Sequence, residues 1–76
     1  MVRVKSPEEI AKRIVMGSIF CYLRGEKNLN WVVGMIRSSG IRKNVFQNLF
    51  SAIRESYAEK PRFQELEKKS KELGYL

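Results

Sequence analysis

The sequence predicts an all-α fold, a small bundle of four helices containing a helix-turn-helix. Apolar residues recur at the spacing of helical stripes, and capping and stop signals bound the four segments. Seventy-six residues allow one domain, so we expect a single helical domain over 1–76. A chain of this length builds a thin hydrophobic core and often needs a partner for stability.

The clearest start signal precedes the first predicted helix, which covers 7–24. Ser6 suits the N-cap position, Pro7 suits the first helical position, and Glu9 completes a capping box. Gly25 supplies the stop, because glycine readily adopts the left-handed conformation that follows many helices.

The apolar run Ile14–Leu23 inside this helix carries no charge. It is far shorter than the roughly 20 residues that cross a bilayer, so we expect no membrane partner. A helix that is apolar on every side should be buried, and a small bundle offers little protein to cover it. Two arrangements stay open. One is a central core helix, and the other is a homodimer through the Ile14–Leu23 face, where Gly17 and Ser18 would allow close approach of a second helix.

The second predicted helix covers 29–38. Asn28 or Asn30 can cap its start, and Gly40 lies where a left-handed residue commonly ends a helix. Gly34 inside this helix costs about 1 kcal/mol relative to alanine. We therefore expect a close contact between helices at that glycine.

The third and fourth predicted helices cover 42–59 and 61–73. Pro61 separates them, because the residue before a proline disfavours helical backbone, and Gly74 ends the last helix. The fourth helix has a narrow apolar stripe among mixed charges, which is typical of a solvated face. The apolar residues of the third recur on one stripe: Ile41, Val45, Phe46, Leu49, Phe50, Ile53 and Tyr57.

A helix, a short turn that contains glycine and a second helix form the outline of a helix-turn-helix. No acidic residue occurs between Glu26 and Glu55, so the turn and most of the third helix lie in a basic window. Basic side chains can bind phosphate oxygens, and Asn and Gln side chains can hydrogen-bond to base edges in a DNA major groove. The alternative is that this face of the helix is simply solvated. The candidate base contacts are Lys43, Asn44, Gln47 and Asn48, and the candidate phosphate contacts are Arg42, Arg37, Arg54 and Lys27.

Composition narrows the classes of partner and chemistry. The net charge of +7 and the pI near 9.9 favour an anionic partner, for which we expect double-stranded DNA; the residues alone do not separate DNA from structured RNA. The absence of His removes the usual general base and zinc ligand, so we expect no enzyme, no metal and no cofactor. Cys21 is the only cysteine, which favours a small buried side chain and a reducing, cytoplasmic location.

Five residues of the predicted turn and third helix carry a resemblance to a known family. Gly40, Ile41, Lys43, Phe46 and Phe50 resemble the turn and recognition helix of tetracycline-repressor-type regulators. The order of a long helix, a short helix and this turn is similar as well. The resemblance implies a small transcriptional regulator that inserts its third helix into the major groove.

By this resemblance Lys43, Asn44 and Gln47 would contact DNA. The sequence departs from the family pattern at three positions. Arg42 stands where a serine is usual, Val45 where a hydroxyl residue is usual, and Gln47 where a tyrosine usually contacts phosphate. The similarity covers only part of the chain and does not extend to the family's ligand-binding region.

A second resemblance concerns the N-terminal segment 1–5, which we expect to be a basic arm. The alternation of valine and basic residues, followed by a helix start, is similar to ribbon-helix-helix repressors, in which a paired N-terminal strand reads the major groove. That resemblance would give the base contacts to Arg3 and Lys5.

A different class of function is a small basic protein-interaction subunit of a larger complex that handles nucleic acid. The motivating features are the apolar run Ile14–Leu23 and two aromatic residues expected at the surface, Tyr22 and Phe63. The mass of the particle in solution would discriminate this alternative from a DNA-binding homodimer.

Overall fold

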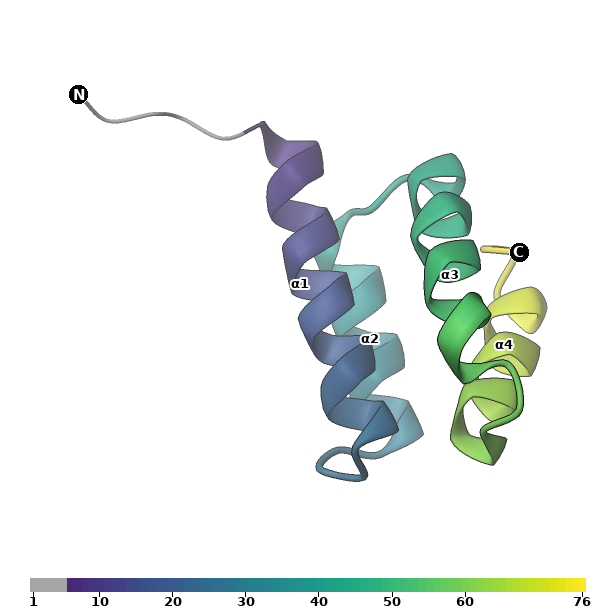
Figure 1. The fold of residues 1–76 in the computed structure, drawn as a ribbon. Coiled ribbons are helices and arrows are strands. Elements are labelled where there is room, and N and C mark those ends of the chain that lie inside the picture. Colours follow the sequence, from purple (N-terminus) through teal and green to yellow (C-terminus); the bar gives the residue numbers. More distant parts are fainter. Residues whose placement is uncertain (1–5) are drawn as a thin grey trace.

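A computed structural model describes residues 6–76, so the predicted arm 1–5, with Arg3 and Lys5, lies outside the described residues. The described part folds into four α-helices: α1 (Pro7–Leu23), α2 (Leu29–Ser39), α3 (Lys43–Tyr57) and α4 (Pro61–Glu72). Figure 1 shows the chain running down and up in alternation through the four helices. The prediction of a small all-α bundle of four helices is confirmed.

The helix boundaries differ from the predicted ones by one or two residues, because the flanking residues serve as caps. Arg24 is the C-cap of α1, Arg42 is the N-cap of α3, and Leu73 is the C-cap of α4. At the end of α3, the residues after Tyr57 form a turn in which the Lys60 N–H donates to the Tyr57 carbonyl at 3.0 Å.

Local capping fixes the start of α1 and the connection between α1 and α2. The Glu9 N–H donates to Ser6 Oγ at 3.2 Å, and the Trp31 N–H donates to Asn28 Oδ1 at 2.8 Å, as predicted for these caps. After α1, the N–H of Glu26 bonds to the Cys21 carbonyl while Gly25 has φ 84°, which is a Schellman ending.

The core draws on all four helices and contains a cluster of aromatic side chains from α3, α4 and the C-terminal segment. The rings of Phe50 and Phe63 stack with centroids 4.5 Å apart, and Phe46 lies 5.3 Å from both Phe50 and Tyr75. Phe63 is 0% exposed and Tyr22 is 1% exposed. The expectation that these two aromatic residues are at the surface is therefore wrong, because each is the anchor that its helix buries in the bundle.

The apolar run in α1 is buried on one side only. Val15, Ile19 and Tyr22 belong to the core, whereas Ile14 is 37% exposed. Ser18 is buried and its hydroxyl donates to the Ile14 carbonyl at 2.6 Å, so it faces the core and not a second chain. The interpretation of α1 as a central core helix therefore holds for only one side of the helix.

Gly34 does not mark a close contact between helices. It is exposed, and a Cβ built on it would meet no atom of the described chain within 4 Å. The expectation of tight packing at this position is wrong, because the buried side of α2 is formed by Val32 and Ile36 and Gly34 lies on the other side.

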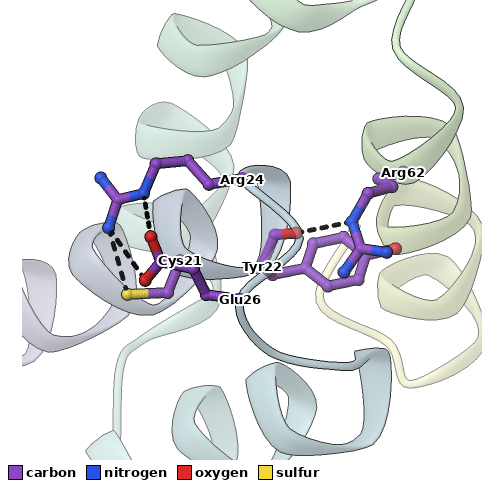
Figure 2. Close-up of polar contacts among 5 residues, drawn as sticks. All are labelled: Cys21, Tyr22, Arg24, Glu26 and Arg62. Atoms are coloured by element: carbon purple, nitrogen blue, oxygen red, sulfur yellow. Dashed lines mark hydrogen bonds and ion pairs between the residues drawn. The ribbon is translucent and has the colours of Figure 1, made fainter.

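Arg62 in the first turn of α4 connects three parts of the fold. Its Nε donates to the Tyr22 carbonyl and its terminal nitrogen donates to the Lys27 carbonyl, both at 2.6 Å. The guanidinium also lies 4.3 Å from the centre of the Tyr22 ring, an arrangement that Figure 2 shows at the end of α1. Arg62 thereby fastens α4 to the α1–α2 connection.

Helix length also bears on the expected absence of a membrane partner. Across residues 6–76, no helix combines the length and the apolar character that a bilayer crossing requires.

Candidate nucleic-acid interface

The exposed face of α3 is set by the stripe that its helix buries. Val45, Phe46, Leu49, Phe50 and Ile53 pack into the core. The helical period therefore turns the intervening residues outward. Lys43, Asn44 and Asn48 are exposed, and Gln47 is half-buried.

Among the described residues, the basic side chain of this face that has no ion-pair partner, Lys43, lies in its N-terminal half, whereas Arg54 near the C-terminal end is paired with Glu67. Lys43 and Asn44 begin it, and Ser51 lies near its middle. Glu55 lies on the same exposed face roughly 18 Å further along the helix axis, at 1.5 Å per residue from Lys43. An anionic partner would thus meet cations and amides at one end of α3 and a carboxylate at the other.

The start of α3 differs from the start of α1. The first turn of α1 has a serine cap and the acidic side chains of Glu8 and Glu9. In α3 the N-cap is Arg42, no side chain of the described residues caps the first turn, and that turn contains no acid. Free backbone N–H groups and the positive end of the helix dipole therefore lie beside two basic side chains, an arrangement that favours phosphate oxygens.

Arg37 joins this end of α3 because it lies in the last turn of α2, just before the connection. That connection turns sharply at Gly40, which has φ 72° as the sequence predicted for a left-handed ending. Within residues 6–76, Arg37, Arg42 and Lys43 are exposed and none of them has a carboxylate within ion-pair distance. Three cations are thus available around one turn.

A depression beside this turn extends the region to the N-terminal end of α1. It is lined by Ser39 to Arg42 from the connection and by Ser6, Glu8 and Ala11 from the start of α1. The first described residue of the chain therefore borders the turn that carries the basic side chains.

Asn48 lies on the other flank of α3, in a groove between α1 and α3. The residues that line this groove include Lys12 and Met16 from α1. Lys12 was not a candidate from the sequence, because it lies more than thirty positions before Asn48. The only sequence signal for Lys12 was that its position in the helical period falls outside the apolar stripe that α1 buries.

Arg54 has other partners in the structure. It forms an ion pair with Glu67 of α4, and its guanidinium lies 5.8 Å from the centre of the Phe50 ring. It also lies roughly 16 Å along α3 from Lys43, given 1.5 Å per residue. Its charge is thus partly neutralised within the bundle.

Lys27 is remote from the other candidates. It lies in the α1–α2 connection, which Figure 1 shows at the end of the bundle opposite the α2–α3 connection. Its ammonium is 5.3 Å from the centre of the Trp31 ring, a cation–π arrangement. Arg37, Arg42, Lys43, Asn44 and Gln47 therefore all lie in or next to the α2–α3 connection, whereas Lys27 lies at the other end of the bundle.

The chemistry of this region is recognition by charge and hydrogen bonding. Its cations can meet phosphate oxygens, and its amides each offer a donor and an acceptor. Among the described residues no three His, Cys, Asp or Glu side chains come together as metal ligands do.

Comparison with known proteins gives this chain no family. No protein-family model matches the sequence, and no curated protein or solved structure is significantly similar to it.

Proposed function

We propose that this protein binds double-stranded DNA through the α2–α3 turn and the N-terminal half of α3, as a small regulator of transcription or an architectural protein. The observation that carries the proposal is that Arg37, Arg42 and Lys43 flank a helix start without a side-chain cap. The amides of Asn44, which is exposed, and Gln47, which is half-buried, follow in the next turn of that helix. Phosphate contacts would position the helix, and the amides would read bases.

The division of labour follows from the side chains. Arg37 and Arg42 flank the turn and serve as phosphate contacts, and Lys43 adds charge at the first helical position. Asn44 and Gln47 lie one turn apart and serve as base contacts, because a planar amide can pair with the N6 and N7 atoms of adenine. Asn48 lies at the edge of this face and would extend it toward α1.

The competing protein-interaction function has lost part of its support. It relied on Tyr22 and Phe63 as surface aromatics, and both are buried. Of the exposed apolar side chains that remain, Ile10, Ile14 and Met16 lie on α1, and Met16 borders the groove that contains Asn48.

The test is a titration of fluorescently labelled random duplex DNA, read by anisotropy, with wild type and with Arg42→Ala/Lys43→Ala. Three phosphate contacts predict that affinity falls about 40-fold between about 50 and 200 mM salt; a single remaining contact predicts a fall of about 3- to 4-fold. The matched control is Lys68→Ala/Lys71→Ala, which removes the same charge from exposed positions on α4.

The proposal is supported if wild type binds DNA with a steep salt dependence, if Arg42→Ala/Lys43→Ala loses that binding, and if Lys68→Ala/Lys71→Ala retains it. Equal losses in the two variants would mean that total charge and not this face binds DNA. Asn44→Ala and Gln47→Ala should change the preference among sequences with little change in salt dependence, and a duplex RNA competitor separates the two nucleic acids.

A further inference from the structure

We propose that the outer side of α1 pairs with the same side of α1 in a second copy of this chain, in antiparallel orientation. This outer stripe consists of Ile10, Ile14, Gly17, Cys21 and Arg24. The spacing of four, three, four and three residues is that of the contact positions along a two-helix seam. The inference concerns self-association and does not depend on DNA binding.

The stripe is left uncovered by the other helices. Ile10 is 47% exposed and Ile14 is 37% exposed, while Gly17 is exposed and Cys21 is half-buried. The core side chains of α1, among them Val15 and Ile19, lie on the other side of the helix. The two exposed isoleucines of α1 thus lie on one line, whereas Met16, which is 38% exposed, lies on the other flank of the helix, toward α3.

The charge distribution favours α1 as the helix through which two copies of this basic chain associate. Residues 6–26 contain three acidic and three basic side chains, whereas residues 27–76 contain ten basic and five acidic ones. Pairing through any later helix would bring two positive surfaces together. Pairing through α1 brings together two surfaces of zero net charge.

The order of charges along α1 selects the antiparallel orientation. Glu9 lies in the first turn and Arg24 is the C-cap, so an antiparallel pair places each carboxylate near the partner copy's guanidinium. A parallel pair would oppose like charges at both ends. Arg24 already contacts Glu26 at 2.9 Å and Cys21 at 3.6 Å (Figure 2), but the ion pair is exposed and leaves the guanidinium accessible.

Gly17 lies at the centre of the stripe and is not required by the fold of one copy. A Cβ built there would meet no described atom within 4 Å, and glycine weakens a helix interior. At the crossing point of an antiparallel pair, two facing glycines permit the helix backbones to approach closely. The pairing therefore gives this residue a structural role that the single chain does not.

This orientation has a consequence for the α2–α3 turns. Each turn borders the N-terminal end of its own α1. Two antiparallel copies of α1 hence carry the turns at opposite ends of the pair, separated by about the 25 Å length of a 17-residue helix.

The experiment is the mass of the full chain by sedimentation equilibrium over a series of protein concentrations, without nucleic acid. We expect self-association to twice 8.9 kDa. Ile14→Glu should raise the dissociation constant more than about tenfold, since it buries a carboxylate at two symmetric positions. The matched control is Leu73→Glu, because Leu73 on α4's C-terminal cap is 36% exposed and lies off the stripe.

Oxidative cross-linking tests the orientation. In the antiparallel pair Cys21 lies opposite Ile14 of the other copy, so Ile14→Cys should cross-link through native Cys21, whereas wild type and Ile14→Cys/Cys21→Ser should not. Positions 14 and 21 of one helix are about 10 Å apart, too far for a disulfide within the chain.

Three results would overturn the proposal. The first is a monomer mass at every concentration, the second is equal dissociation by Ile14→Glu and Leu73→Glu, and the third is ready cross-linking of wild-type Cys21, which would indicate a parallel pair. Circular dichroism of each variant at low concentration verifies that the helices remain folded.

Discussion

Replacing Arg62 by methionine tests whether one side chain fastens α4 to the rest of the bundle. Methionine retains an unbranched apolar chain and removes both hydrogen bonds and the cation over Tyr22. Neither acceptor is left orphaned, because the Tyr22 carbonyl keeps the Gly25 N–H at 3.0 Å and the bond to the Lys27 carbonyl is exposed to water.

The expected loss in the free energy of unfolding is therefore the net contribution of the Arg62 contacts, with no large penalty for a buried carbonyl left without a partner. A part-buried hydrogen bond from a charged donor contributes about 1.5 kcal/mol, and we assign about 0.5 kcal/mol to the exposed one. The cation–π contact with Tyr22 adds about 0.5 kcal/mol. The free energy of unfolding should fall by about 2.5 kcal/mol, which lowers Tm by roughly 10–20 °C in a domain of this size.

The assay is urea denaturation followed by circular dichroism, for wild type, Arg62→Met, Arg62→Lys and the control Arg37→Met. Lysine restores the charge but not the planar fork that reaches two carbonyls, so Arg62→Lys should recover less than half of the loss. Arg37 is exposed and has no ion-pair partner among residues 6–76, so its replacement should change stability by less than about 0.5 kcal/mol. An Arg62→Met variant as stable as Arg37→Met would refute the reasoning.

Two further predictions concern stability. Gly34→Ala should raise the free energy of unfolding by about 0.5–1 kcal/mol, because the helical position is open, whereas Gly40→Ala should lower it by about 1 kcal/mol because its φ is 72°; a denaturation series that gave both changes the same sign would contradict this. Burial, followed by the nearby carboxylate of Glu65, raises the pKa of Tyr22 above 10.0. The unfolded chain therefore loses the phenol proton first, so this contribution to stability is complete below about pH 10 and declines as pH rises toward the folded-state pKa. Wild type should lose more stability than Tyr22→Phe across that interval, and equal pH profiles would refute the assignment.

The helix ends could be predicted from the sequence because each depends on neighbours within a few positions. Ser6 and Asn28 cap the turn that immediately follows them, and the left-handed bend at Gly40 requires only that residue's own backbone freedom. The outward direction of Lys43 and Asn44 is likewise a consequence of the helical period once the apolar stripe of the third helix is recognised.

Which side of α1 is covered, and which basic residues lie together, depends on how helices pack. Nothing in a short window distinguishes Tyr22, which is buried, from an exposed aromatic, or shows that Arg62 will reach the Lys27 carbonyl thirty-five positions away. Lys27 lies in the same basic stretch of sequence as Arg42, yet the length of α2 separates them in space. Local hydrogen bonding specifies the helices, whereas the partners of each helix face arise only when distant segments compete to bury their apolar stripes.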